Sequence, residues 1–310
     1  MEPEVEIRRA ETRYPTDFGW LQSRHCFSFG THHDPSNVGH GLLIVSNDDR
    51  VAPGAGFGPH SHRDMEIVTW VLDGTLVHHD SEDNHGELFP GLVQRMSAGT
   101  GITHSEMNGS ETAPVRFVQM WVPPDTRGLP PSYEERDMND ALNGGGLVPV
   151  ASGGEHPGAV TLHQESAVMY VARSNDGEQV TLPDAPFVHL YVAKGTAAVD
   201  SANGSAPAHT PPPYAYAENA GTGSTGFDST APDNTGSEST GSDSTRFDNT
   251  GSGSTGFDNT GSESTGFSGG APAMLNEGDA VRLTGAGAGV VTSIGRSEII
   301  VWETHRKAER

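Results

Sequence analysis

The sequence predicts an all-β protein made of two antiparallel β-barrel domains. Short runs rich in β-branched and aromatic residues recur along the chain, separated by Gly, Pro, Asn and Asp turn signals, a rhythm typical of barrels and sandwiches. Almost no segment shows the apolar period of a helix. The order of strand, glycine turn and strand in residues 1–125 returns after residue 160, which indicates a second barrel of similar construction.

The expected strands follow one another closely in both halves. Asp73-Gly74, flanked by IVTWVL and TLVHHD, is a strong short-range hairpin signal. In chain order, the segments expected to form strands and their turns are 5–13, 20–30, 41–51, 56–74, 75–83, 86–108, 115–124, 159–173, 179–184, 187–200 and 273–304.

These segments predict a first domain over residues 1–130, a connection over 131–159 and a second domain over 160–310. The connection is rich in turn residues and has room for about one helical turn. Residues 201–270 interrupt the second domain and are nearly pure Gly, Ser, Thr, Asn, Asp and Pro, with ten-residue repeats from Gly221. Each repeat offers at most one phenylalanine, so we expect a disordered acidic loop inserted at a hairpin tip.

The net charge of the chain indicates which classes of binding partner are disfavoured. Asp and Glu number 41 against 18 Lys and Arg, which gives a formal net charge of −23. Such a field repels phosphate backbones and anionic lipid, so direct nucleic-acid or membrane binding is not expected. A protein partner remains compatible with this charge. Cys26 is the only cysteine and lies in an apolar run, so we expect a buried, inert thiol.

No apolar run approaches the length of a membrane span, and the first residues lack the apolar stretch of a secretory signal. We therefore expect a cytoplasmic protein. We also expect a monomer.

Two glycine-bounded strands carry the side chains best suited to chemistry. The first, GFGPHSHRDMEIVTWVLDG, contains His60 and His62, and the second, GTGITHSEMN, contains His104 and Glu106. Because strand side chains alternate between faces, each pair projects from one face of its strand. Three imidazoles and one carboxylate can then meet at a common centre if the strands are neighbours in a closed sheet. This set predicts a site for one divalent transition metal.

Other residues near these strands have less certain roles. Glu66 has the same parity as the two histidines of its strand, so it is expected to face inward as a further ligand or a support for the ligands. His78 and His79 face opposite ways, and their spacing identifies neither as a ligand.

Three residues of the segment 115–124 share one face of the predicted strand: Phe117, Gln119 and Trp121. If that face points inward, it offers an aromatic wall and an amide to a planar ligand. Ordinary core packing explains the same pattern equally well.

The motifs HxHxxxE and GxGxxHxE, together with two barrel halves, resemble the cupin superfamily. HCFSFGTHHDP, GFGPHSHRDMEIVTWVLDG and MSAGTGITHSE are similar to the pirin family, and in particular to its bacterial branch often described as quercetin 2,3-dioxygenases. The resemblance covers roughly residues 14–140 and, less closely, 160–200 and 273–303. It implies a bicupin of two jelly-roll barrels whose C-terminal barrel is free of metal.

The resemblance also implies roles for individual residues. The metal ligands of the family correspond to His60, His62, His104 and Glu106, whereas the carboxylate at Glu66 is not a ligand in the family. Fe(II) is the expected metal, although Mn, Co, Ni, Cu or Zn suits the same ligands. Family members with quercetinase activity cleave a flavonol with O₂ to a depside and CO. In that reaction Glu106 is expected to be the catalytic base for the flavonol 3-hydroxyl.

Two other functions are compatible with the same residues. Some pirins resemble non-enzymatic, iron-dependent regulators that bind a transcription factor or a metabolic enzyme. A cupin acting on an unrelated small molecule is the third alternative, since a fold does not determine its chemistry.

Overall fold

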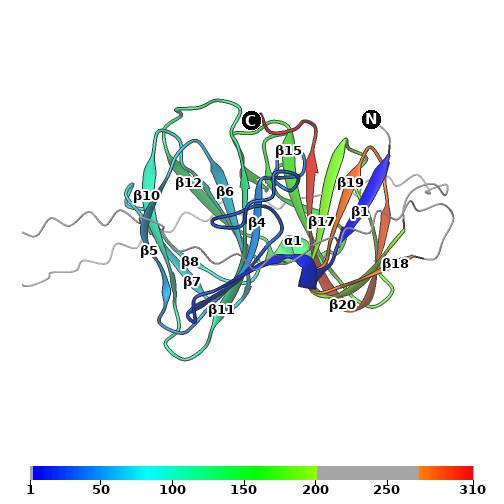
Figure 1. Cartoon of the computed structure of the whole chain (residues 1–310), viewed down its shortest axis with the longest axis horizontal. Helices are drawn as coiled ribbons and strands as arrows, with labels where there is room; N and C mark the ends of the chain where they lie inside the picture. Colours follow the sequence, from blue (N-terminus) through cyan, green and yellow to red (C-terminus); the bar gives the residue numbers. More distant parts are fainter. Residues whose placement is uncertain (1–2, 201–271, 310) are drawn as a thin grey trace, which may run out of the picture. The chain divides into compact units, whose positions relative to one another are not determined.

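The computed structural model describes residues 3–200 and 272–309 and consists almost entirely of antiparallel strands (Figure 1). The repeat segment predicted over 201–270 lies outside the described residues. Within the described ranges, helical structure is limited to the 3-10 turn η1 (Ala10–Thr12) and the short α1 (Asn139–Asn143). The all-β fold class predicted from the sequence is therefore confirmed.

The N-terminal half is built from two sheets. Seven strands follow the order β12-β9-β6-β11-β4-β3-β2, and four follow the order β5-β10-β7-β8. The strands are β2 (Tyr14–Asp17), β3 (Leu21–His25), β4 (Val45–Val51), β5 (Gly56–His62), β6 (Glu66–Asp73), β7 (Leu76–Asp80), β8 (His85–Leu88), β9 (Leu92–Ser97), β10 (Ile102–Asn108), β11 (Val115–Val122) and β12 (Ser132–Asp137).

The C-terminal half is one nine-stranded sheet, in which the two longest strands pair with each other and bend together. The register shifts near Gly195, whose φ is +78° and where an added Cβ would lie 2.1 Å from the carbonyl oxygen of Arg296. Only glycine fits this bend. The strands are β1 (Glu4–Arg8), β13 (Val148–Ser152), β14 (Val160–Thr161), β15 (Ala167–Ser174), β16 (Gln179–Thr181), β17 (Phe187–Asp200), β18 (Ala273–Asn276), β19 (Ala280–Thr284) and β20 (Val290–Thr304).

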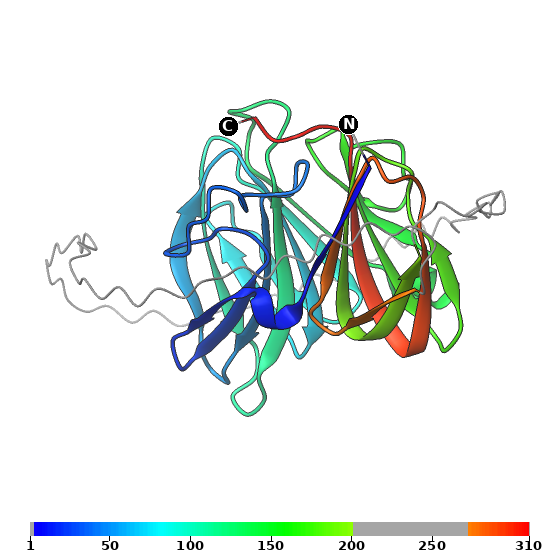
Figure 2. The same cartoon turned by 45° about the vertical axis from the view of Figure 1, so that its right-hand side comes forward.

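Two features of the chain path differ from the predicted domain limits. The first strand, β1, pairs with β19 of the C-terminal sheet, although its residues belong to the segment 1–130 (Figure 2). The predicted connection, 131–159, contains the expected helical turn but also regular strands, since β12 pairs with β9 and β13 pairs with β15. Long-range pairing partners, which local sequence does not specify, account for both differences.

The strands that flank the repeat segment form a hairpin. Val199 of β17 pairs with Ala273 of β18, and the antiparallel register continues to Thr196 and Asn276. The chain therefore leaves the second sheet and returns to it at neighbouring positions.

The largest buried cluster lies between the two halves. Alternate residues of β6 and β11 point away from the interior of the N-terminal half and pack against β13, β15, β17 and β20. Burial of each large apolar side chain contributes about 1.5–3 kcal/mol relative to exposure. The main contributors are Val68, Trp70, Leu72, Val118, Met120 and Val122 from one half, with Val148, Val150, Met169, Val171, Tyr191, Ile300 and Trp302 from the other.

Polar contacts cross the same interface. The indole Nε1 of Trp70 donates to Glu298 Oε1 at 2.6 Å. Asp48 of β4 accepts hydrogen bonds from Arg116 at 2.9 and 2.8 Å and from the Tyr191 hydroxyl of the other half. Buried polar groups are thus satisfied by partners from both halves, which specifies how the halves pack.

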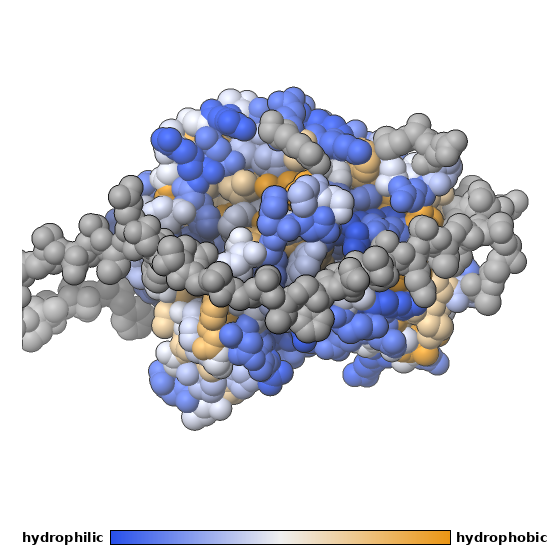
Figure 3. Space-filling view, in the orientation of Figure 1, coloured by the Kyte–Doolittle hydropathy of each residue, from blue (hydrophilic) through white to orange (hydrophobic). Residues whose placement is uncertain are grey.

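The outer surface seen in Figure 3 is mostly polar, with small and scattered apolar areas. The large apolar side chains exposed among the described residues are few: Phe18, Phe89, Met107, Met274 and Ile294. No helix in residues 3–200 and 272–309 is long and apolar enough to span a membrane.

We expect Trp70→Phe to lower the free energy of unfolding by about 1–3 kcal/mol, because it leaves a buried carboxylate oxygen of Glu298 without its indole donor. Urea denaturation measures this change. Trp20→Phe is the matched control, since Trp20 is partly buried and its indole makes no hydrogen bond to another described residue. A Trp70 variant no less stable than the Trp20 variant would contradict the role of this hydrogen bond.

Candidate metal centre

Strands β5 and β10 bring the histidines together. They pair antiparallel, so that His104 lies opposite His60 and Ile102 lies opposite His62. Between His104 and Glu106 the register shifts, and Glu106 lies opposite Phe57. The bulge redirects side chains at this point, as bulges near functional sites commonly do.

Three imidazole rings form a compact cluster. The ring centroids are separated by 4.3 Å for His60 and His104, 4.9 Å for His60 and His62, and 5.0 Å for His62 and His104. One nitrogen from each ring lies within 4.8 Å of the others, a grouping that could hold a metal ion. Neutral imidazole nitrogens are common ligands of divalent transition metals.

The ring nitrogens that make no hydrogen bond are suited to bind a metal ion. His60 donates its Nδ1 hydrogen to the carbonyl oxygen of Gly58 at 2.9 Å, which leaves Nε2 with the lone pair. The Nε2 atoms of His62 and His104 are buried and have no hydrogen-bond partner among the described residues. Burial, followed by the neighbouring histidines, lowers the pKa of His62 to about 4 and of His104 to about 2. Both rings are therefore neutral at pH 7 and fit a bound cation.

A fourth histidine, His78 of β7, determines the tautomer of His104. Hydrogen bonds from His78 and Asn84 keep the pKa of Asp80 below its usual value, although burial alone would raise it. The resulting carboxylate accepts the Nε2 hydrogen of His78 at 3.1 Å. His78, whose pKa is lowered mainly by burial, then presents an Nδ1 lone pair 3.4 Å from Nδ1 of His104. His104 donates its Nδ1 hydrogen there, so its Nε2 lone pair is left for a metal.

Glu106 lies at the base of the cluster and is fully buried. Both of its carboxylate oxygens accept from Gln119 Nε2 at 2.9 Å, and Gln119 Oε1 accepts from Trp121 Nε1 at 3.1 Å. Burial raises the pKa of Glu106 to about 7. Its carboxylate forms a second potential metal-binding group with His78 and His104, separate from the three-histidine group but sharing His104.

The other residues predicted to lie near the metal site occupy different environments. Trp121 lies beside the histidines, with its ring centroid 4.9 Å from that of His62, whereas Phe117 packs in the apolar core of the N-terminal half. Glu66 does not face the cluster: its Oε2 accepts from Ser97 Oγ at 2.8 Å and from the backbone N–H of His163 at 3.1 Å. The turn after β5 contains Asp64 at a φ of +49°, which breaks the period-two count from which the inward direction was predicted.

Two polar residues beside the centre were not singled out by the sequence patterns. His78 could have been noticed through its i, i+2 spacing to Asp80, which places both side chains on one face of a strand. Asp49 of β4 gives no such signal. It is buried with Oδ1 unpartnered among the described residues, and burial raises its pKa to about 7, with Asp48 and Glu106 adding to the effect.

Comparison with known proteins identifies the family. The pirin family model matches residues 6–122. A protein from Mycobacterium tuberculosis, provisionally named a quercetin 2,3-dioxygenase, is 59% identical over 194 residues, which cover 62% of this chain and 79% of the relative. This chain belongs to the pirin family of the cupin superfamily.

Two further proteins from Escherichia coli resemble this chain, one in sequence and one in structure over nearly its whole length. The quercetin 2,3-dioxygenase of Escherichia coli is 39% identical over 202 residues, covering 65% of this chain and 86% of that protein. The bacterial pirin YhhW of E. coli, solved in complex with nickel(II), superposes with a TM-score of 0.69 at 26% identity over 98% of this pirin and 100% of YhhW. A pirin of this fold therefore binds a divalent metal.

We expect His78→Phe to weaken the binding of Ni²⁺ about 10- to 100-fold, because His104 loses the acceptor that orients its ring. Isothermal titration calorimetry on the metal-free protein measures the dissociation constant. His79→Phe is the control, since His79 is exposed on the other face of the same strand. His78→Asn, whose amide oxygen can accept from His104, should restore part of the affinity. Equal affinities of the His78 and His79 variants would refute this role.

Asp49 should make the metal-free protein less stable as the pH rises. Its folded pKa of about 7 exceeds the ordinary value of 3.8, so the folded state retains a proton that the unfolded chain releases. The contribution of Asp49 to the free energy of unfolding is complete below pH 4 and is lost between about pH 4 and 7. Asp49→Asn cannot ionise, so its stability relative to wild type should increase from pH 4 to pH 8, by at most about 4 kcal/mol.

Urea denaturation across this pH range tests the Asp49 prediction. Asp184→Asn is the control, because Asp184 is exposed and makes no hydrogen bond or ion pair among the described residues. A difference between Asp49→Asn and wild type that does not change with pH would show that Asp49 is not the responsible group.

Proposed function

We propose that this pirin is a metal-dependent quercetin 2,3-dioxygenase, which cleaves a flavonol with O₂ and releases CO. The observation that carries the proposal is a fully buried carboxylate, Glu106, beside a cluster of neutral histidines with unpartnered nitrogens. The names of the relatives from M. tuberculosis and E. coli support the same substrate class.

We further propose that His60, His62, His104 and Glu106 together hold the metal, with His104 as the ligand common to the two potential metal-binding groups. Fe(II) is the first candidate, and Ni(II) is supported by the complex of YhhW. Mn, Co, Cu and Zn suit the same donors, because affinity alone does not discriminate among them. When bound, such an ion supplies a Lewis acid that favours the deprotonated form of a flavonol 3-hydroxyl.

The residues of the chain account for the proton transfer. In the metal-free protein, burial raises the pKa of Glu106 to about 7, and a bound cation would lower it, so the carboxylate would be ionised at neutral pH and able to accept the 3-hydroxyl proton. Gln119 donates to both carboxylate oxygens and so fixes their orientation. Trp121 holds the Gln119 amide through its indole N–H and offers its ring as a wall for a planar substrate.

The overall reaction balances without a further reductant. The flavonol and O₂ together contain all the atoms of the depside and of CO, and O₂ is the oxidant. We expect the substrate to be a small flavonol-like aromatic compound. No observation on the described residues favours the regulatory alternative over this reaction.

Glu106→Gln should lower turnover of quercetin at least about 100-fold, because the amide cannot accept the proton, while metal binding should fall much less. The measurement combines the loss of flavonol absorbance, the release of CO and the metal content of the purified protein. Glu87→Gln is the matched control, since Glu87 is exposed on β8 and makes no hydrogen bond or ion pair among the described residues.

Two outcomes would change the proposal. Equal losses of turnover and metal in Glu106→Gln would make Glu106 a ligand only. Wild-type protein with stoichiometric metal, no CO release and no flavonol loss would refute the dioxygenase and favour the regulatory alternative. CO release that disappears in His62→Ala would tie the reaction to the histidine cluster.

A further inference from the structure

A large cleft lies between the loop that precedes β4 and the C-terminal half. Its volume is about 1120 Å³, which is large for a small-molecule site. Five cations line it, although the chain as a whole carries a net charge of −23. These cations are Arg8, Arg63, Arg127, Arg282 and Lys307.

Two of the cations share one carboxylate. Glu6 pairs with Arg8 at 2.6 Å and with Arg282 at 3.3 Å. The Nε atoms of both arginines are buried and have no hydrogen-bond partner among the described residues. Arg282 is only 5% exposed, and burial and the nearby Arg8 lower its pKa. Arg282 also donates from Nη2 to the carbonyl oxygen of Cys26 at 2.9 Å and to Asn37 Oδ1 at 2.7 Å, so its Nε is the nitrogen left without an acceptor. Arg8 and Arg282 have only the carboxylate of Glu6 as an ion-pair partner among the described residues, so an additional anion would offset their remaining positive charge.

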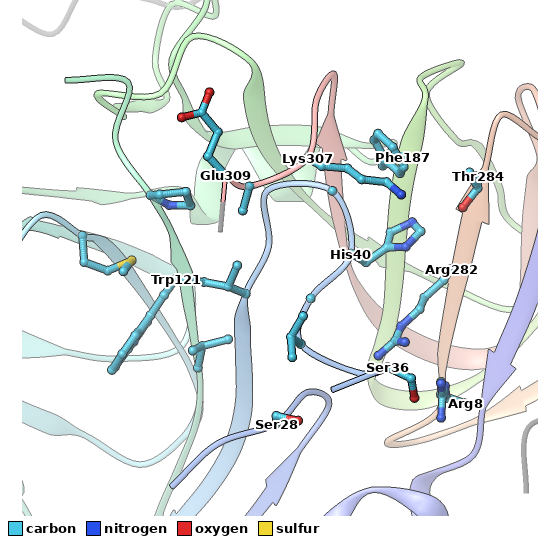
Figure 4. A pocket seen from close by; sticks show the side chains of 18 of the residues that line it. Arg8, Ser28, Ser36, His40, Trp121, Phe187, Arg282, Thr284, Lys307 and Glu309 are labelled. Carbon is cyan, nitrogen blue, oxygen red and sulfur yellow. The ribbon is translucent and has the colours of Figure 1, made fainter. Parts of the chain in front are cut away.

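Lys307 adds a third positive charge to this side of the cleft. Within residues 3–200 and 272–309 it forms no ion pair, and its Nζ lies 5.5 Å from the ring centroid of Phe187. The backbone N–H of Ala308 donates to the carbonyl oxygen of Gly41 at 2.9 Å, which fixes the segment that carries Lys307. Figure 4 shows Lys307, His40 and Arg282 along one side of the cleft, with Trp121 across from them.

Four carboxylates also line the cleft, namely Glu4, Glu6, Asp64 and Glu309, so the five cations leave one net positive charge. Asp64 accepts the backbone N–H of Gly128 at 2.7 Å, and the remaining two, Glu4 and Glu309, are exposed. The pKa of His40 reflects the positive charges near its ring. Burial, then the charges of Arg282 and Lys307, lower the pKa of His40 to about 4, so its ring is neutral and adds no charge of its own.

The rest of the wall is apolar enough for an organic ligand. Phe187 and Trp121 line it together with Val38, Ile44, Met65 and Pro123. Trp121 also contacts the His62 ring, so the cleft and the metal centre share this one side chain. The cleft lining contains none of the three clustered histidines and lacks Glu106, so the cations form a site separate from the metal centre.

We propose that this cleft binds a small organic carboxylate with an aromatic body. Arg282 and Lys307 hold the carboxylate, and the apolar side chains between Phe187 and Trp121 contact the ring. A guanidinium matches the planar carboxylate, whereas Lys307 acts as a point charge. The assignment does not depend on the dioxygenase reaction.

Benzoate and its uncharged counterpart benzamide test the site by calorimetric titration of the full chain. Benzoate should bind, and benzamide should bind at least about tenfold more weakly, because it lacks the charge that the cations recognise. Lys307→Gln should weaken benzoate binding about tenfold. Arg50→Gln is the control with the same change in net charge, since Arg50 is exposed at the far end of β4 and outside the cleft.

His104→Ala separates this site from the metal centre, where a carboxylate could also bind to a metal. Benzoate binding that persists in His104→Ala and weakens in Lys307→Gln supports the cleft, whether or not the protein turns over quercetin. Arg282→Gln should weaken binding further, but its buried contacts make Lys307→Gln the decisive variant. Binding lost in His104→Ala, unchanged in Lys307→Gln, or equal for benzamide would overturn the proposal.

Discussion

Burial of the outer face of β6 and β11 against the C-terminal sheet is the constraint on which the rest of the molecule depends. Because β6 is covered on both faces, all of its residues from Glu66 to Leu72 are buried, which explains its nearly continuous apolar sequence. The strand next to it, β11, turns Val118 and Met120 toward the interface and Gln119 toward the site. The interface thereby fixes the wall that carries Gln119 and Trp121.

A second constraint is the protonation state of the titratable side chains buried inside the N-terminal half. Burial keeps His62, His78 and His104 neutral, and it favours the protonated forms of Glu106 and Asp49. Asp80 is ionised because hydrogen bonds to its carboxylate outweigh the effect of burial on its pKa. It accepts the Nε2 hydrogen of His78, and His78 in turn accepts the Nδ1 hydrogen of His104, which fixes the tautomers of both histidines. A metal ion is the natural partner for neutral nitrogens held in this way.

The distribution of charge separates two regions of different chemistry. The metal centre presents neutral rings and one buried carboxylate, whereas the neighbouring cleft concentrates arginines and a lysine in an otherwise acidic protein. Trp121 contacts both regions and joins them physically. The proposed organic anion would therefore lie beside, and not within, the proposed metal site.

The sequence by itself determined the all-β class, the family and the shared strand face of His60 and His62, because strand alternation and local motifs are properties of neighbouring residues. The pairing of β5 with β10 then brought His104 to them. Tertiary structure alone decided the rest. Pairing with distant strands assigned β1 to the C-terminal sheet, a positive-φ turn directed Glu66 away from the site, and the neighbouring β7 supplied His78. The cleft lies between segments far apart in the chain, so its cations, from Arg8 to Lys307, meet only when the two halves pack.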